Sequence, residues 1–91
     1  MKQQTYEEID IKKLKYCTWN PRKIATEDLD RLKNSIREFG QVQTLVIDEN
    51  NIVLGGNQRL KALRELTYTG NIKAIRLTGY TETEKKAVNI A

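Results

Sequence analysis

The segment Gly55-Gly56-Asn57-Gln58-Arg59 combines residue types that can bind an anion. It follows the apolar residues 52–54 and precedes leucines at helical spacing, so a strand should pass directly into a helix there. The first N–H groups of such a helix lack intrahelical partners, and the helix dipole adds positive charge beside them. Glycines permit positive φ and a close approach of the ligand, Asn57 can cap the helix, and Arg59 can donate two hydrogen bonds. The pattern therefore predicts a phosphate site made by Gly55, Gly56, Asn57, Gln58 and Arg59.

The same glycine pattern also has a purely structural interpretation. Two glycines form an ordinary tight turn between a strand and a helix, and an arginine in a first helical turn often contacts only solvent. The pattern is less specific than a P-loop, because no Lys-Ser or Lys-Thr pair follows the glycines. Both interpretations stay open at the level of sequence.

Arg22, in Asn20-Pro21-Arg22, is a second candidate phosphate ligand. Proline holds the preceding residue extended and marks a turn before a helix, from which Arg22 can reach across to the same anion. Alternatively, Arg22 pairs with acids of that helix, a surface contact worth about 0 to 1 kcal/mol. Trp19, beside this turn, can stack on a base or pack against the core.

Four acidic residues are candidates for catalysis: Asp10, Glu38, Asp48 and Glu49. A carboxylate pair at strand ends can hold Mg²⁺ on nucleotide phosphates or activate a hydroxyl group. Asp48 and Glu49 also fit a hairpin loop, in which both side chains would be solvated.

Composition excludes several classes of mechanism. The chain of 91 residues has no histidine and only one cysteine, Cys17, so we expect neither a Cys/His zinc site nor an internal disulfide, and no Ser-His or Cys-His catalysis. Sixteen basic and twelve acidic residues give a net charge of +4, which favours a nucleotide or nucleic acid as partner. No apolar run approaches the roughly 18 residues of a membrane span, and residues 1–5 lack the apolar core of a signal peptide, so a cytoplasmic protein without membrane contact is expected.

The elements that must position these residues are short strands and three helices. Strands are predicted at residues 6–11, 45–47, 52–54 and 72–77, with 48–51 as a hairpin loop and Lys12, Lys13 and Lys15 in a surface turn. The first helix should begin after an N-cap at Thr26 and end at Gly40, with Leu29, Leu32, Ile36 and Phe39 on one face. The second should follow the glycines with Leu60, Leu63 and Leu66 as its buried stripe, and the third should begin with a capping box of Thr81 and Glu84.

This element order predicts the α+β class, with a small mixed β-sheet and about three helices packed mainly on one face. The expected core consists of Leu29, Leu32, Ile36, Leu45, Ile47, Val53, Leu60, Leu63 and Ile75. Residues 1–91 should form a single domain. Because Thr83, Ala87, Ile90 and Ala91 form an apolar stripe that stops at the last residue, we expect a fragment or module of a larger protein. Its last helix would contact a second copy or a covalently linked downstream domain.

Several segments together resemble the N-terminal domain of the ParB and sulfiredoxin superfamily, also called the ParB-like nuclease domain. They are Asn20-Pro21-Arg22, Ser35 to Gly40, Gln43 before an apolar strand, and Gly55 to Ala62. Residues 81–89 look most similar to ParB-like domains of phage proteins or of proteins found beside DNA methyltransferases. The resemblance covers nearly the whole chain and implies a sulfiredoxin-like fold in which Gly56-x-x-Arg59 opens a helix and contacts nucleotide phosphates, with Arg22 near the same pocket.

The chain lacks motifs that two groups of the superfamily, sulfiredoxins and CTP-hydrolysing partition proteins, carry. Sulfiredoxins carry a catalytic cysteine in Gly-Gly-Cys-His-Arg, where this chain has Asn57 and Gln58, and Cys17 lies outside the turn, so we interpret it as a packed thiol. The Glu-Asn-x-Gln-Arg box and the helix-turn-helix domain of CTP-hydrolysing partition proteins do not follow, and Thr44 replaces the usual proline after Gln43.

Three functional hypotheses remain open. The favoured one is a DNA-handling module, of phage or plasmid type, that binds nucleotide or nucleic-acid phosphate, with CTP or ATP and Mg²⁺ as candidate ligands. The alternatives are a small nuclease or nucleotide-dependent phosphoryl transferase, and a protein-interaction domain with a vestigial phosphate turn.

Overall fold

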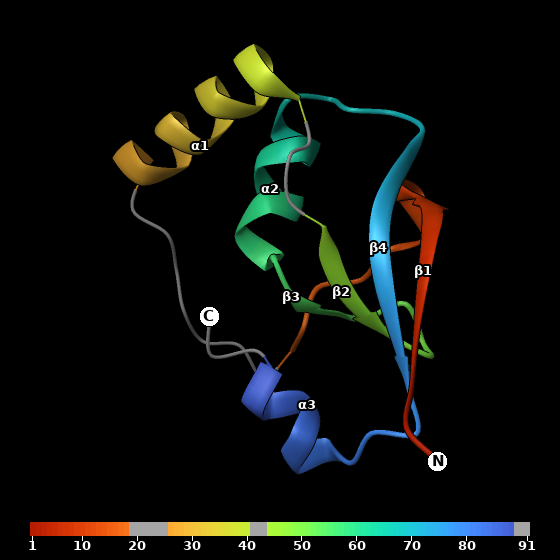
Figure 1. Ribbon diagram of the computed structural model, residues 1–91. Helices are drawn as coiled ribbons and strands as arrows, with labels where there is room; N and C mark the ends of the chain where they lie inside the picture. Colours follow the sequence, from red (N-terminus) through yellow and green to blue (C-terminus); the bar gives the residue numbers. More distant parts are fainter. Residues whose placement is uncertain (19–25, 41–43, 89–91) are drawn as a thin grey trace.

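The computed structural model describes residues 1–18, 26–40 and 44–88 of the chain. In this part of the chain four strands form one sheet: β1 (Gln3–Asp10), β2 (Leu45–Asp48), β3 (Val53–Gly55) and β4 (Asn71–Thr78). Their spatial order is β1-β4-β2-β3 (Figure 1). The β1–β4 and β2–β3 pairs are antiparallel and the β2–β4 pair is parallel, so the predicted mixed sheet is confirmed.

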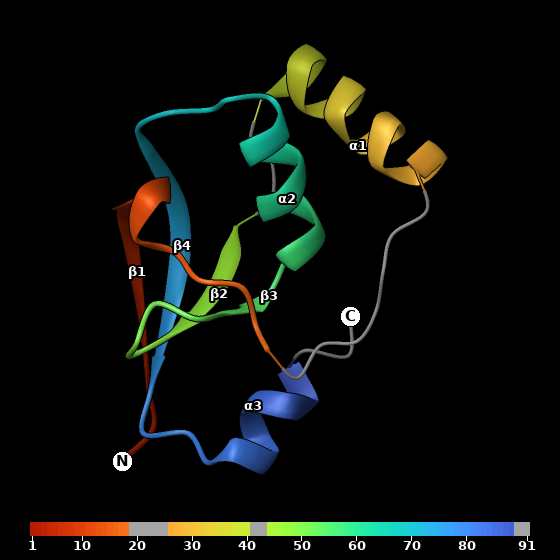
Figure 2. The same ribbon diagram turned by 180° about the vertical axis from the view of Figure 1, so that it is seen from behind.

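Three α-helices and one short 3₁₀ helix accompany the sheet: α1 (Thr26–Phe39), α2 (Asn57–Glu65), α3 (Glu82–Val88) and η1 (Ile11–Lys13). Helix α2 lies beside the sheet, α1 packs on α2, and α3 contacts β3 at the other end of the molecule. Figures 1 and 2 show α1 and α2 on the same side of the strands and α3 apart from them. The α+β class with three α-helices is therefore confirmed. None of the helices in the described ranges is long and apolar enough to cross a bilayer.

Two predicted helix ends, the start of α3 and the end of α1, are formed by the expected residues, whereas Thr26, predicted as the N-cap of α1, is its first helical residue. The Thr81 Oγ1 accepts a hydrogen bond from the Glu84 N–H at 3.2 Å, and the Glu84 Oε1 accepts one from the Thr81 N–H at 3.0 Å. This reciprocal pair is the capping box predicted for α3. At the end of α1, Gly40 has a φ of 75° and donates its N–H to the Ile36 carbonyl at 2.7 Å.

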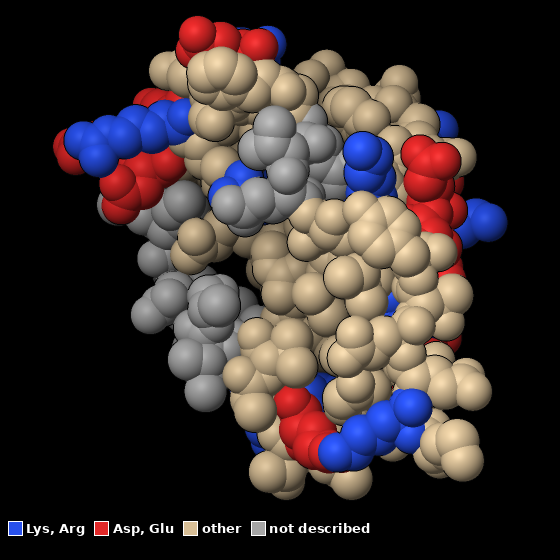
Figure 3. All heavy atoms as spheres, in the orientation of Figure 1, with Lys and Arg blue, Asp and Glu red and all other residues tan. Residues whose placement is uncertain are grey.

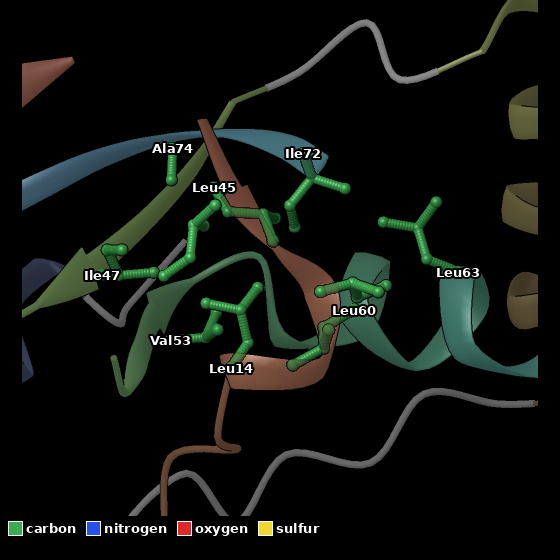
Figure 4. Packing of buried hydrophobic residues seen from close by; sticks show 10 residues of the cluster. Leu14, Leu45, Ile47, Val53, Leu60, Leu63, Ile72 and Ala74 are labelled. Atoms are coloured by element: carbon green, nitrogen blue, oxygen red, sulfur yellow. The ribbon is translucent and has the colours of Figure 1, made fainter. Parts of the chain in front are cut away.

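The core lies between α2 and the inner face of the sheet (Figure 4). Six of the nine predicted core residues are buried: Leu29, Leu45, Ile47, Val53, Leu60 and Leu63. Sequence reasoning missed five members of the main hydrophobic cluster, contributed by β1, η1, the residue after it, and β4: Ile9, Ile11, Leu14, Ile72 and Ala74. Ile9, Ile11 and Leu14 are buried because residues 9–14 lie around the end of the sheet, which periodicity within one segment does not indicate. Ile72 and Ala74 are buried because they lie on the inner face of β4.

Three predicted core residues, Leu32, Ile36 and Ile75, are only partly buried. The first two lie on α1, which packs on α2 rather than on the sheet, and Phe39 of the same helix is 65% exposed. Ile75 is one residue removed from Ala74, and successive side chains of a strand point to opposite faces. It therefore lies on the outer face, whose centre is largely uncharged in Figure 3.

Residues 14–17 extend the sheet beyond β3. Lys15 forms a parallel bridge with Ile52: its N–H donates to the Asn51 carbonyl at 2.9 Å, and its carbonyl accepts from the Val53 N–H at 2.9 Å. In Figure 2 this segment passes across β2 and β3. The basic turn predicted at Lys12, Lys13 and Lys15 thus consists of η1 and a stretch that covers the edge of β3.

Candidate functional site

Gly56 makes the turn between β3 and α2. It has a φ of 98°, in the left-handed region, and its carbonyl accepts the first intrahelical bond, from the Leu60 N–H at 2.9 Å. A Cβ at this position would also collide with Leu45 Cδ2. Gly55, in contrast, has no positive φ, and a Cβ there would lie at ordinary contact distances, 3.5 Å from Val46 Cβ. Of the two glycines, which can both adopt positive φ, Gly56 does so and Gly55 does not.

The N–H groups of Asn57, Gln58 and Arg59 form the first turn of α2, ahead of its first intrahelical hydrogen bond at Leu60. All three residues are half-buried. Such N–H groups, with the positive end of the helix dipole, can donate to phosphate oxygens, and the Arg59 guanidinium supplies a full positive charge on the same turn.

Asn57 does not cap α2, contrary to our prediction. It is the first helical residue, and the N-cap is Gly56, which has no side chain to cap with. The Asn57 side chain instead donates from Nδ2 to the Val53 carbonyl at 2.7 Å and accepts at Oδ1 from the Cys17 N–H at 3.0 Å. It thereby ties residues 14–17 to the turn, a contact that joins positions 40 residues apart and has no signal in the local sequence. Cys17 is buried, as expected of a packed thiol.

The predicted second arm of the site lies outside the described residues. This applies to Trp19, Asn20, Pro21 and Arg22, and also to Gln43 before β2. Of the predicted phosphate ligands, the structure therefore places Gly55, Gly56, Asn57, Gln58 and Arg59, and it brings these five together in one turn.

Three of the four candidate catalytic acids, Asp10, Asp48 and Glu49, make hydrogen bonds or ion pairs within the protein. Asp48 is 3% exposed, and its Oδ1 accepts from the N–H groups of Asn50 and Ile52 at 2.8 and 2.9 Å. Its Oδ2 lies 3.3 Å from the Nζ of Lys85 in α3, which is itself 6% exposed and lies 2.6 Å from Glu49 Oε1. The expectation that Asp48 is solvated is wrong, because the short loop turns its carboxylate inward onto backbone donors and Lys85.

The Glu49–Lys85 pair shifts the pKa of each of its two partners toward the charged form. The hydrogen bond from Lys85 lowers the pKa of Glu49, and the same bond raises the pKa of Lys85 against the opposing effect of burial. A cation already occupies the space between the two carboxylates, so they do not fit a Mg²⁺ site. The other two acids, Asp10 and Glu38, do not complete one: Asp10 caps η1 through the Lys12 N–H at 2.9 Å, and Glu38 is exposed on α1. Among the described residues, no group of three or more His, Cys, Asp or Glu side chains is arranged to hold a metal ion.

Arg76 of β4 forms a second network that sequence reasoning missed. Its Nη2 lies 2.6 Å from Glu7 Oε1, and its Nη1 donates to the Asp48 carbonyl and to Asn51 Oδ1, both at 2.8 Å. The hydrogen bond to Arg76 lowers the pKa of Glu7. Arg76 therefore joins β1 and the β2–β3 loop to the central strand, and we assign it a structural role. The one sequence signal for it is a charged residue interrupting an apolar strand.

Comparisons with known proteins agree with this architecture. The ParB N-terminal domain family matches residues 1–90 of the chain. The chain is 31% identical over 67 residues to the ParB-like nuclease domain-containing protein YnaK of Escherichia coli K12, covering 74% of this chain and 76% of that protein. It is 37% identical over 62 residues to a probable chromosome-partitioning protein ParB of Campylobacter jejuni, covering 64% of this chain but only 22% of the relative.

Solved structures of the same fold extend the comparison. A C-terminally truncated ParB from Caulobacter crescentus, complexed with CTP-γ-S, superimposes with a TM-score of 0.83 at 22% identity, over 94% of this chain and 51% of that one. A pNOB8-like ParB N-domain superimposes with a TM-score of 0.74 at 23% identity, over 97% of this chain and 34% of that one. From the family match over residues 1–90, together with the shared fold, the chain belongs to the ParB N-terminal domain family.

Proposed function

We propose that the turn from Gly55 to Arg59 binds the phosphates of a nucleotide. The observation that carries this proposal is Gly56, whose left-handed backbone starts α2 so that three N–H groups and Arg59 share one turn. Phosphates would accept from the N–H groups of Asn57, Gln58 and Arg59, and Arg59 would neutralise their charge. Arg22 is the proposed second cation.

CTP is the first ligand to test and ATP the second. The Caulobacter ParB of the same fold was solved with CTP-γ-S, which makes a cytidine triphosphate the natural probe. Magnesium would enter with the triphosphate, because the Asp48 and Glu49 carboxylates are bonded to Lys85. The protein would act as a nucleotide-binding module of a DNA-handling protein of phage or plasmid type.

The name of the E. coli relative keeps nuclease activity as a second candidate. The ion pairs of Asp48 and Glu49 argue against a carboxylate-metal mechanism at that position, so we rank binding above catalysis. Phosphodiester cleavage of a labelled oligonucleotide in the presence of Mg²⁺ would reverse this order.

Replacing Arg59 with Ala tests the site directly. The variant should fold with a stability within about 0.5 kcal/mol of the wild type, because Arg59 lies off the buried stripe of α2. Loss of a charge-assisted hydrogen bond should weaken binding of CTP or ATP by about 1.5 to 3 kcal/mol, measured by calorimetric titration.

Lys61→Ala is the matched control, since Lys61 is an exposed cation two residues further along the same helix. It should leave nucleotide binding unchanged. If the wild type binds neither CTP, ATP nor a short duplex, the turn is structural and the interaction-domain alternative takes its place. Equal binding by wild type and R59A would move the site elsewhere.

A further inference from the structure

Three lysines of the segment around η1 have no carboxylate partner. Lys12, Lys13 and Lys15 are exposed, and none of them forms an ion pair within the described part of the chain. Several basic side chains elsewhere are paired with carboxylates: Lys33 with Glu65, Arg76 with Glu7, and Lys85 with Asp48 and Glu49. Residues 11–18 contain these three lysines and no acid, a net charge of +3 against +4 for the whole chain.

Arg64 of α2 adds a fixed cation to this surface, and the Tyr16 side chain beside it adds an aromatic ring. Its Nη2 donates to the Leu14 carbonyl at 2.5 Å and to the Ile11 carbonyl at 3.3 Å. Its guanidinium carbon lies 4.9 Å from the centre of the Tyr16 ring, and Tyr16 is 43% exposed. Because the Arg64 guanidinium donates to backbone carbonyl groups and not to a carboxylate, no negative charge neutralises it.

Two acids adjacent in sequence to these residues, Asp10 and Glu65, make other contacts. The Asp10 side chain caps η1 by accepting from the Lys12 N–H at 2.9 Å. Glu65, which follows Arg64 in α2, is paired with Lys33 of α1, and the hydrogen bond from Lys33 lowers its pKa. The positive charge of the segment therefore faces solvent beside an exposed aromatic ring.

We propose that Lys12, Lys13, Lys15, Tyr16 and Arg64 form a binding surface for single-stranded nucleic acid, separate from the phosphate turn. The lysines contact the backbone phosphates, and Tyr16, supported from one side by Arg64, stacks on a base. The segment runs from η1 across β3 to Cys17, whose N–H is bonded to Asn57 at the phosphate turn. A bound strand would thus lie along the edge of the sheet (Figure 2).

The test measures binding of a fluorescent oligodeoxythymidine of about 16 nucleotides by anisotropy over a range of salt concentrations. Replacing Lys12, Lys13 and Lys15 with Ala should weaken binding. It should also reduce the slope of log K against log[salt] by about 2, because each phosphate contact on a single strand contributes about 0.7. Replacing the same residues with Arg should restore binding. Tyr16→Ala should weaken binding about tenfold while leaving the salt slope unchanged.

A second triple variant, in which Lys2, Arg31 and Lys86 are replaced by Ala, serves as the control. It removes the same number of positive charges from other parts of the molecule: the residue before β1, α1 and α3. All three are exposed. Equal losses in the two triple variants would show only an effect of net charge and would overturn the proposal, as would no loss in either. Unchanged binding in Tyr16→Ala would overturn the stacking role and with it the preference for single strands.

Two further measurements distinguish nucleic acid from a membrane as the ligand, and this surface from the phosphate turn. The protein should not bind vesicles that contain phosphatidylserine. If it binds these vesicles and does not bind the oligonucleotide, the surface is a membrane-binding surface and the proposal is overturned. Arg59→Ala should retain oligonucleotide binding, which keeps this result distinguishable from the outcome at the phosphate turn.

Discussion

At the scale of single residues, the two glycines of the turn between β3 and α2 are not equivalent. Replacing Gly56 with Ala should reduce the free energy of unfolding by about 1 to 3 kcal/mol, because the new Cβ adds left-handed strain and meets Leu45. Urea denaturation measures this loss. Gly55→Ala is the control: its Cβ meets only ordinary contacts, so stability should change by less than about 1 kcal/mol. Equal losses in the two variants would contradict the assignment of the turn to Gly56.

The residue scale also shows what sequence can and cannot predict for the site. Gly56, Gln58 and Arg59 were placed correctly in the turn because a strand, a glycine pair and a helix follow one another along the chain. The contacts of Asn57 were not foreseen, since its partner Cys17 is 40 residues away. The role of Lys85 could not be predicted for the same reason. Its partner Asp48 lies 37 positions earlier, and the local sequence around each of the two residues does not indicate their contact.

At the scale of elements, Lys85 attaches α3 to the β2–β3 loop. Replacing it with Met should reduce the free energy of unfolding by about 2 kcal/mol, because the buried Asp48 carboxylate then loses its cation. Hydrogen exchange of residues 82–88 should accelerate more than that of β4, since α3 is the element released.

Asp48→Asn in the Lys85→Met background should recover part of this loss, because Asn can still accept from the N–H groups of Asn50 and Ile52. Lys86→Ala, at the exposed neighbouring position of the same helix, serves as the matched control and should change stability by less than about 0.5 kcal/mol. Uniform acceleration of exchange throughout the molecule would mean that α3 is not an independent unit.

Elements themselves were easier to predict than their packing. The strands, the three α-helices and the capping box of Thr81 and Glu84 follow from short-range patterns, and all are present. The orientation of α1 was not predictable, because its apolar stripe does not specify whether a sheet or another helix covers it. The structure places it on α2, which leaves Phe39 exposed.

At the scale of the whole molecule, two ion pairs between segments far apart in the sequence should make stability depend on acid pH. The pKa values of Glu7 and Glu49 are lowered below the ordinary 4.5 by hydrogen bonds from Arg76 and Lys85. The unfolded chain therefore binds protons first: the contribution is complete above about pH 4.5 and is lost as the pH falls through the lower folded values. Urea unfolding at a series of pH values between about 6 and 3 measures it.

A double variant, Glu7→Gln with Glu49→Gln, provides the comparison for this pH series. It should be less stable than the wild type at neutral pH and should lose less stability on acidification, since two of the titrating groups are gone. Parallel curves for the two proteins would show that other carboxylates control the acid response.

The register of β1 with β4 has a consequence for how the chain acquires its fold during synthesis. Gln3 pairs with Thr78 and Asp10 with Asn71, so β1 must wait after its synthesis until β4 has been made. At about 5 to 20 residues per second this wait lasts on the order of ten seconds. During that time Ile9, Ile11 and Leu14, which are buried in the finished core, have no sheet to cover them. The nascent chain thus exposes these three apolar side chains before β4 emerges, and non-local pairing of this kind slows folding relative to a helical domain of equal length.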